Sequence, residues 1–435
     1  MSFRLHSLIS NRLSRALLAS GLLSLSLGAS AAVEITIAHQ LDDARANRLQ
    51  QVVDRFNAEQ KDYHVVLKFH NDGEAPGDLN LADRDNLSHF VGGKVEYKPL
   101  FQVLSDARVK VDLSHIAPAL KGGVTDSRGR LVALPVAYST PVLFYNKAAF
   151  RRAGLDAENP PKTWWQVQAA AGKLVKAGYS CPYTTSWPAW VHIDNVSARS
   201  GAEPVVHGTE TTFNSMAQIK HIALLSSWYK AKYFVTFGRT NEADAHFAKG
   251  ECGMLTSSSD LYASLRDKSD LEVGVAPLPY YDDIFGGARQ ALADGASLWV
   301  GPGRKPVEYK GVAKFVSFLM APDMQLEISK AGGFLPLTTA SALATRGKLL
   351  GADFANQQVA YSQLGGAAPR SAYSKTGSNL TMVSRIEPVR VIIDEELEAV
   401  WANKKPAKEA LDDAVARSNA VLRSNRPLQH VATIR

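Results

Sequence analysis

The sequence predicts an α/β protein of two lobes, and three observations carry this prediction. Patterns typical of strands and of helices alternate along the chain, which is characteristic of the α/β class. The chain has 435 residues, of which 46% are hydrophobic and 21% charged, enough apolar material for more than one core and too much for a disordered chain. No internal repeat and no linker of altered composition divides it, so two lobes with several chain crossings fit the length.

The first 31 residues have the pattern of an export signal. Three arginines and no acidic residue precede an apolar stretch, Ala16–Leu27, and the segment ends in an Ala29-x-Ala31 pattern that suits signal peptidase. The apolar stretch is shorter than the roughly 20 residues that a membrane-spanning helix needs, and no cysteine follows it to carry a lipid. We therefore expect a mature protein exported to the periplasm, with no stable membrane insertion.

Charge and cysteine content narrow the functional classes further. The net charge is +7, and removal of the three arginines of the signal leaves +4. Since the remaining basic residues are scattered among acidic ones, we expect no nucleic-acid partner. Cys181 and Cys252 are too few for a zinc ribbon. In an oxidising compartment they form one disulfide or stay two buried thiols, and the sequence leaves both possibilities open.

The amino-terminal elements open with a strand, a helix and a second strand. Val33–Ala38 alternates apolar and polar residues as a half-buried strand does. Asp42 and Asp43 offer a cap for a helix that runs to about residue 59, and Tyr63–Phe69 is the next strand. This order predicts a parallel, helix-covered sheet. Residues 71–91 are polar and poorly periodic, so we expect a loop with a short helix there.

Alternation of the same kind continues to the carboxyl terminus. The helix expected at Trp164–Ala177 is preceded by two prolines, which end the preceding element, and by Thr163, which can cap the amino terminus of the helix. The other helices are expected at Ala148–Ala153, Met216–Lys230, Gly311–Met320, Val391–Ala402 and Ala407–Leu422. The further strands are expected at Leu131–Pro135, Val142–Asn146, Cys252–Thr256, Leu271–Ala276 and Ser297–Val300.

Sequence patterns that would indicate catalysis are missing. The chain has no Walker A, G-x-G-x-x-G, H-E-x-x-H or G-x-S-x-G pattern, and its eleven histidines do not pair at metal-ligand spacing. We therefore expect no catalytic residue, no bound metal and no cofactor. A secreted phosphodiester hydrolase stays as an alternative, although it would need a metal cluster or an activated nucleophile.

Several longer motifs point to one family. They are Ser139–Lys147 (STPVLFYNK), Ala148–Leu155 (AAFRRAGL), Pro160–Trp164 (PPKTW), Ser186–Trp190 (SWPAW), Gly295–Val300 (GASLWV) and Arg390–Trp401 (RVIIDEELEAVW). With them the sequence resembles the extracellular solute-binding proteins of ABC importers, and among these the branch that binds glycerol 3-phosphate. The resemblance is strong over residues 131–424, moderate over 33–63, and nearly disappears over 71–104.

The resemblance implies a periplasmic binding protein fold: two α/β lobes, a hinge between them, and the ligand held in the cleft. We expect residues 32–140 and 296–336 to form lobe 1, and residues 141–295 and 337–435 to form lobe 2. The family works as a monomer whose closure over the ligand presents a surface to the transmembrane permease subunits of the importer. We expect the same two kinds of partner here, a small molecule and a permease.

The family's phosphate-binding positions are matched by four residues of this chain. The resemblance implies that Ser139 and Ser258 donate hydroxyl hydrogen bonds, that Gly295 allows the backbone to approach the ligand, and that Arg390 holds the phosphate. The set is chemically coherent, because a phosphate favours hydroxyl and amide donors together with the planar fork of an arginine, and glycine permits close approach.

The resemblance also implies an aromatic wall in the ligand site, and it shows positions at which this chain differs from the family. Trp187 and Trp190 match an aromatic pair that flanks the glycerol carbons. The family has a tyrosine where this chain has Gly73, beside Glu74, and a second tyrosine where this chain has Phe334. A further family glutamate has no clear counterpart here. Loss of a partner for a buried ligand hydroxyl costs about 1–3 kcal/mol, so these changes bear on specificity.

Five polar residues near the altered region are candidates to replace the lost donors and acceptors: His39, Asp42, Asp43, Asp72 and Glu74. A solvated acidic loop explains them equally well. The resemblance therefore implies a substrate-binding protein for glycerol 3-phosphate or for a glycerophosphodiester such as glycerophosphocholine. The alternative ligand is a neutral sugar, which the tryptophan pair permits and which Arg390 with the two serines disfavours.

Overall fold

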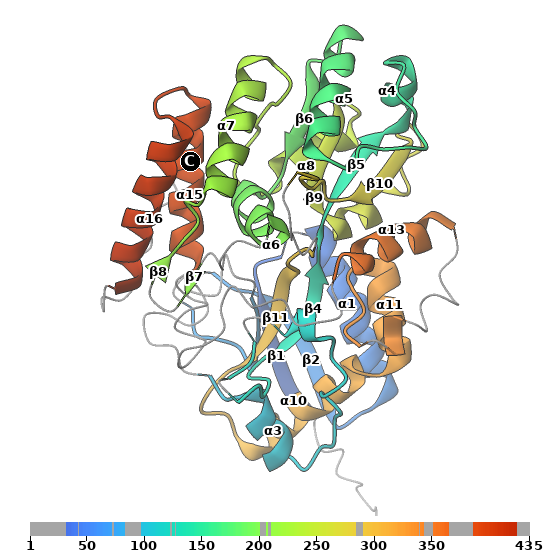
Figure 1. Ribbon diagram of the computed structural model, residues 1–435. Coiled ribbons are helices and arrows are strands. Elements are labelled where there is room, and N and C mark those ends of the chain that lie inside the picture. The colour runs from blue at the N-terminus through green and yellow to red at the C-terminus, as the bar shows by residue number, and fades with distance from the viewer. Residues whose placement is uncertain are drawn as a thin grey trace, which may run out of the picture.

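The computed structural model describes most of the chain after the predicted export signal. The described residues are 32–41, 43–71, 74–82, 97–121, 124–126, 128–200, 206–207, 210–283, 290–338, 340–342, 351–364 and 386–423. The predicted signal at residues 1–31 and the candidates Asp42, Asp72 and Gly73 lie outside them. Two mixed sheets, each covered by helices, form the two halves of the molecule (Figure 1). Within the described part of the chain, no helix is long and apolar enough to cross a bilayer.

The first sheet has the strand order β2-β1-β3-β11-β4. Its strands are β1 (Val33–His39), β2 (Tyr63–Phe69), β3 (Leu79–Ala82), β4 (Leu134–Ser139) and β11 (Asp294–Val300). β1 pairs in parallel with β2 and β3, as the strand–helix–strand opening predicts, whereas β11 runs antiparallel to both β3 and β4. The helices of this half are α1 (Asp43–Glu59), α3 (Leu100–Asp106), α10 (Pro306–Leu319) and α11 (Pro322–Gly332), with a 3-10 turn at Pro118–Leu120.

The second sheet has the order β10-β5-β9-β6. Its strands are β5 (Pro141–Asn146), β6 (Cys181–Thr185), β9 (Cys252–Ser258) and β10 (Val273–Pro277). The helices around it are α4 (Lys147–Arg152), α5 (Trp164–Lys176), α6 (Asn195–Ser200), α7 (Met216–Lys230), α8 (Glu242–Ala248), α9 (Tyr262–Leu265), α13 (Gly351–Ser362), α15 (Ile386–Trp401) and α16 (Ala407–Arg423). A π-helix, η2 (Ala189–Asp194), a 3-10 turn, η3 (Ser259–Leu261), and a small hairpin, β7 (Val206–His207) with β8 (Glu210–Thr211), complete it.

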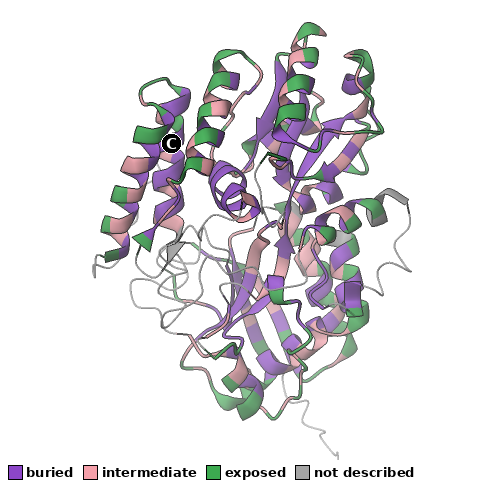
Figure 2. Cartoon of the chain, viewed as in Figure 1, coloured by how far each residue is buried: buried purple, intermediate pink, exposed green. Residues whose placement is uncertain are grey.

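Two apolar clusters stabilise these layers. One is centred on the first sheet, where Phe56 of α1 packs edge-on against Phe315 of α10, and it extends to one face of the second sheet. The other fills the opposite face of the second sheet, beneath α5, α7, α15 and α16, around the fully buried Trp164 and Trp228. The strands are accordingly buried while the outer faces of the helices are exposed (Figure 2).

Most of the predicted helices and strands are present. Where the structure differs from the prediction, the cause is local. The predicted bounds of β2 and α7 are confirmed, and Thr163 caps α5 through a capping box with Gln166. The expectation of a loop at residues 71–91 is wrong for β3, because this strand has four residues, all buried, and is too short to show a period. β4 lies at Leu134–Ser139 rather than Leu131–Pro135, and β6 was not predicted.

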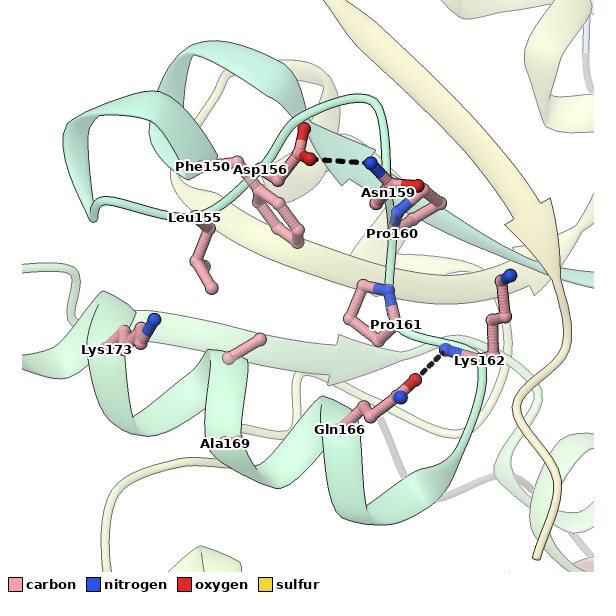
Figure 3. Close-up of a pocket in the computed structure, with 11 residues that line it drawn as sticks. Phe150, Leu155, Asp156, Asn159, Pro160, Pro161, Lys162, Gln166, Ala169 and Lys173 are labelled. Carbon is pink, nitrogen blue, oxygen red and sulfur yellow. Dashed lines mark hydrogen bonds between the residues drawn. The ribbon is translucent and has the colours of Figure 1, made fainter. Parts of the chain in front are cut away.

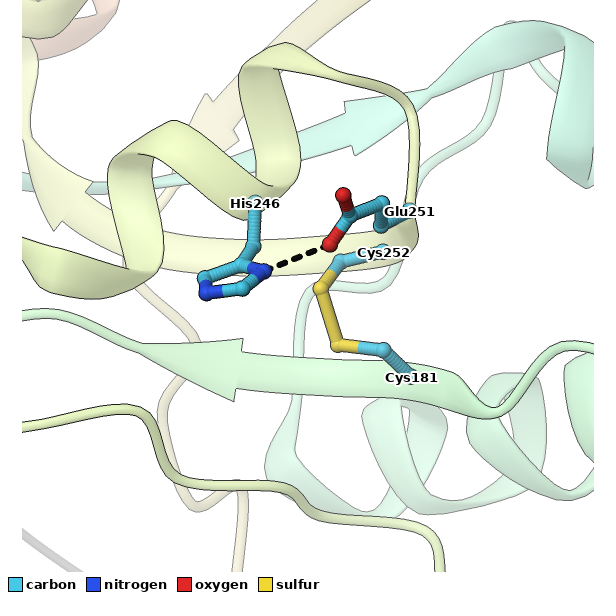
Figure 4. Close-up of a disulfide and its surroundings, with 4 residues drawn as sticks. All are labelled: Cys181, His246, Glu251 and Cys252. Atoms are coloured by element: carbon cyan, nitrogen blue, oxygen red, sulfur yellow. Dashed lines mark hydrogen bonds and ion pairs between the residues drawn. A yellow bond between two sulfur atoms is a disulfide. The ribbon is translucent and has the colours of Figure 1, made fainter.

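The two cysteines form a disulfide across neighbouring strands. Cys181 of β6 stands directly opposite Cys252 of β9 in the parallel register, with 4.6 Å between the Cα atoms (Figure 4). That separation lies within the usual range for disulfides. The sequence left open whether the cysteines form a disulfide or stay buried thiols, and the structure shows the disulfide.

Candidate functional site

The register of the strands brings one edge of each sheet to the junction between the two halves. In the first sheet the carboxyl ends of β1, β2, β3 and β4 share an edge with the amino end of β11. In the second sheet the carboxyl ends of β6, β9 and β10 share an edge with the amino end of β5. The chain passes from β4 to β5 through the fully buried Thr140, whose hydroxyl donates to Ala360 O at 3.0 Å.

Ser139 and Ser258 meet at this junction. Ser139 ends β4 and Ser258 ends β9, and their hydroxyls are hydrogen-bonded to each other although 119 positions separate them. The Ser258 hydroxyl also donates to the carboxylate of Asp260 in the following turn. The structure thus places together the two hydroxyls that the family resemblance pairs, and it adds an acidic neighbour that the sequence analysis did not select.

Arg390 lies at the same junction, buried and ion-paired. Its Nη2 atom donates to Asp294 Oδ2 at 2.8 Å and to Asp194 Oδ2 at 3.1 Å, and all three side chains are 15% exposed or less. Asp294 stands opposite Ser139 in the β11–β4 register, which joins the arginine to the serine pair. The resemblance implies a guanidinium turned towards a phosphate, and neither carboxylate was predicted, although each lies within four residues of a predicted site residue.

Gly295 follows Asp294 on β11 and adopts a backbone conformation that only glycine tolerates. Its φ is +152°, and a Cβ atom there would lie 2.0 Å from the carbonyl oxygen of Ala137 on β4. Glycine is therefore required to let β11 and β4 approach each other at the junction. The close approach seen here is to a neighbouring strand.

We expect Gly295→Ala to destabilise the fold by roughly 3 kcal/mol or more, because it combines a forbidden φ with a backbone clash. Gly303→Ala is the matched control: Gly303 also has a positive φ, +70°, but nothing lies within 4 Å of its hypothetical Cβ, so about 1 kcal/mol is expected. Urea unfolding measures both. Equal losses in the two variants would contradict the role given to the β4 contact.

The tryptophan pair belongs to one short segment that runs from the end of β6 into η2. Trp187 has a φ of +54°, which is rare for a bulky residue, and its N–H donates to Thr240 O at 2.8 Å. Trp190, in η2, is 4% exposed and packs in the second apolar cluster. The structure therefore assigns Trp190 largely to the core, while the partly exposed Trp187 lies beside the junction in a conformation that needs support.

Buried histidines hold the η2 helix that carries Trp190 and Asp194. His192 Nε2 lies 3.2 Å from Tyr183 Oη, and His192 Nδ1 lies 2.9 Å from His221 Nε2. His221 Nδ1 in turn contacts Tyr281 Oη at 2.7 Å. Burial lowers the pKa of His221 to about 3 and that of His192 well below its usual value, so both rings stay neutral at ordinary pH.

Phe334 is also near the junction. A side chain at Gly333, which has a φ of +70°, would lie 3.0 Å from the backbone of Asp260, and Leu335 N donates to Tyr138 O at 2.8 Å. The segment that carries Phe334 is thus held between the Ser258 turn and the end of β4.

Glu74 is not joined to this group. It is exposed on the loop after β2 and accepts hydrogen bonds from Asn71 N and Asn71 Nδ2, both at 3.2 Å, which lower its pKa. Of the other candidate replacements, His39 is buried at the carboxyl end of β1 and stacks edge-on against Phe69, whereas Asp43 is exposed at the start of α1. The hydrogen bonds from Asn71 give Glu74 a local structural role.

The pocket in Figure 3 lies elsewhere. It has a volume of about 330 Å³ and is formed by α4, the loop after it and one face of α5, around Phe150, Leu155 and the proline pair. None of the eight predicted site residues lines it. In the described part of the chain, no group of three or more potential ligands is arranged to hold a metal ion.

Comparison with known proteins identifies the family of the chain. The sequence profile of the family described as "Bacterial extracellular solute-binding protein" matches residues 51–356. This chain belongs to that family. It is therefore a solute-binding protein and not an enzyme, which confirms the prediction from sequence.

Two relatives illustrate how far the similarity extends. The sn-glycerol-3-phosphate-binding periplasmic protein UgpB of Yersinia pseudotuberculosis is 37% identical, over 92% of this chain and 95% of its own. The protein of the same name from Pectobacterium atrosepticum is 36% identical, over 92% of this chain and 93% of its own.

Solved structures with similar folds cover nearly the whole chain. UgpB from Mycobacterium tuberculosis in complex with glycerophosphocholine has a TM-score of 0.71 at 20% identity, covering 89% of this chain and 98% of that one. The cyclic alpha-maltosyl-1,6-maltose binding protein from Arthrobacter globiformis has a TM-score of 0.69 at 21% identity, covering 90% and 99%. These likenesses confirm the predicted fold class, the two-lobed α/β fold of this solute-binding family.

Proposed function

We propose that this protein is the substrate-binding component of an ABC importer and captures a small phosphorylated polyol, glycerol 3-phosphate or a glycerophosphodiester, for delivery to the permease. The observation that carries the proposal is the convergence of Ser139, Ser258 and Arg390 at the junction of the two sheets. Hydroxyl donors beside an arginine are the groups that recognise phosphate. The similarity to periplasmic glycerol-3-phosphate-binding proteins over 92% of the chain supports the same ligand class.

The charge balance around Arg390 favours a diester among these ligands. Asp194 and Asp294 already contact the guanidinium. A phosphate monoester would add close to two negative charges at neutral pH to these two carboxylates, whereas a diester would add one. We therefore expect glycerophosphocholine to bind more tightly than glycerol 3-phosphate.

The positions of the strands support the predicted division into two lobes. β4 ends at Ser139 and β5 begins at Pro141, which supports a lobe boundary at Thr140. β11 begins at Asp294, two residues before the boundary expected at residue 296, and α15 and α16 pack beside α7 of the second half. We propose residues 32–140 and 296–336 as lobe 1, and residues 141–295 and 337–435 as lobe 2. The seven predicted site residues other than Glu74 would then lie around the cleft between the lobes.

Export supports a periplasmic location. The arginines, apolar stretch and small residues of residues 1–31 have the order of a cleaved signal peptide, and the relatives are named as periplasmic proteins. We propose that the mature chain begins after Ala31, works as a monomer and has no nucleic-acid partner.

A thermal-shift panel tests the ligand class. At a ligand concentration 100-fold above Kd, binding should stabilise the protein by about 2.7 kcal/mol, which raises Tm visibly. We expect this shift with glycerophosphocholine and, more weakly, with glycerol 3-phosphate, and none with glycerol or maltose. A shift with maltose and none with either phosphorylated compound would contradict the proposal in favour of a neutral-sugar carrier.

A further inference from the structure

Asp244, in the first turn of α8, joins two segments of the candidate site. Its Oδ1 atom accepts hydrogen bonds from Ser186 Oγ at 2.6 Å and from Ser257 Oγ at 2.7 Å. Ser186 directly precedes Trp187, and Ser257 directly precedes Ser258. One carboxylate oxygen therefore connects the segment of the tryptophan pair to the turn of the serine pair. No sequence motif singled this residue out.

The start of α8 supports Trp187 in a second way. Thr240 O accepts from the N–H of Trp187 at 2.8 Å, and Thr240 N donates to Glu242 Oε2 at 2.8 Å. The positive φ of Trp187 costs conformational energy unless the surroundings hold it. The contacts to Thr240 and to Ser186 from the α8 region are of the kind that hold such a residue in place.

We propose that Asp244 is a positioning residue of the ligand site, which holds the Trp187–Trp190 segment and the Ser258 turn in one fixed arrangement by accepting from both preceding serines. The assignment of ligand contacts to these two segments rests on the proposed function. Asp244 itself need not touch the ligand, because its hydrogen bonds run through Ser186 and Ser257.

The charges around Asp244 make its effect depend on pH. Its pKa is raised to about 6, mainly by burial and to a smaller extent by the negative charge of Asp260, although the hydrogen bonds from the two serines and the charge of Arg45 on α1 act in the opposite direction. β9, against which α8 packs, carries no ionisable residue between Gly253 and Ser258. As pH rises through about 6, a negative charge therefore develops beside the Ser258 turn, and the affinity for an anionic group there should fall.

Calorimetric titration with glycerophosphocholine tests this, because its phosphodiester keeps the same charge between about pH 5 and pH 7.5. We expect wild-type affinity to fall about fivefold across that range. Asp244→Asn keeps the acceptor oxygen and loses the charge, so its affinity should match the wild type at about pH 5 and stay constant. Asp244→Ala should bind about tenfold more weakly throughout, because both serines lose their acceptor.

Asp156→Asn is the matched control, since Asp156 likewise accepts from neighbouring residues of the second half, at Glu158 N and Asn159 Nδ2, and lies in the loop after α4. It should behave as the wild type. Wild-type affinity in Asp244→Ala, or a wild-type pH profile in Asp244→Asn, would overturn the proposal. If Asp244→Ala does not fold, the pH profile of Asp244→Asn decides alone.

Hydrogen exchange separates this inference from the proposed function. If the wild type binds no phosphorylated polyol, the proposed function fails, and the positioning role is still tested by the amides of Ser186 and Trp187, which donate to Thr256 O and Thr240 O. Both should exchange at least about tenfold faster in Asp244→Ala than in the wild type or in Asp156→Asn. Unchanged exchange would overturn the positioning role whatever the ligand.

Discussion

Replacing Arg390 by alanine is expected to destabilise the folded protein by about 3–5 kcal/mol, before any ligand is considered. The reason is that Arg390 is the cation that contacts both Asp194 and Asp294 in a buried position. Removing one partner of a buried ion pair takes away compensating charge in a medium of low polarity, here from two carboxylates. Urea unfolding at neutral pH measures the loss.

Arg239→Ala is the matched control for this prediction. Arg239 makes a two-pronged pair with Glu398 on α15, with both distances at 2.6 Å, but these side chains are 38% and 52% exposed. An exposed pair contributes about 0–1 kcal/mol. If Arg390→Ala unfolds at the same urea concentration as Arg239→Ala, the buried ion-pair cluster does not have the stabilising role given to it here.

The expected loss of stability in Arg390→Ala affects how Arg390 should be tested as a ligand-binding residue. Weak binding by Arg390→Ala would not separate loss of a phosphate contact from collapse of the junction. Arg390→Lys keeps a positive charge for Asp194 and Asp294 but removes the planar fork that suits a phosphate. A variant that stays folded and loses affinity would identify the contact directly.

Removal of the disulfide is the other change with a large expected effect. The bridge joins residues 71 positions apart, and the entropy of closing a loop of that length in the unfolded chain corresponds to about 4 kcal/mol. The double variant Cys181→Ala, Cys252→Ala should therefore unfold at a clearly lower urea concentration than the oxidised wild type. Coincident unfolding curves would contradict the prediction.

Ligand affinity should be nearly unchanged in the same double variant. Cys252 opens β9 and Ser258 closes it, so at about 3.3 Å per residue the bridge lies roughly 20 Å from the serine pair. Wild-type protein treated with a reducing agent is the control, because it loses the disulfide but keeps both cysteine side chains. A loss of affinity comparable to the loss of stability would indicate that the bridge shapes the junction itself.

Much of the architecture could be predicted because it is written in local patterns. The alternation in Val33–Ala38, the helical spacing of Met216–Lys230 and the Thr163 cap each depend on residues a few positions apart, and the strand, the helix and the cap that they predict are present. β3 escaped prediction because four buried residues show neither alternation nor a helical period. The extended motifs around Ser139, Gly295 and Arg390 were long enough to indicate the family.

The sequence by itself determined the α/β class, the family and some of the residues that gather at the junction of the sheets, among them Ser139, Ser258 and Arg390. Only the tertiary structure decided how those residues are engaged. Arg390 meets Asp194 across 196 positions and Asp294 across 96, and Asp244 meets Ser186 across 58. No local pattern encodes such pairs, because they form only when elements far apart in the sequence pack against one another. The physical reason is that periodicity sets which face of an element is buried, whereas packing between elements sets which buried charges meet.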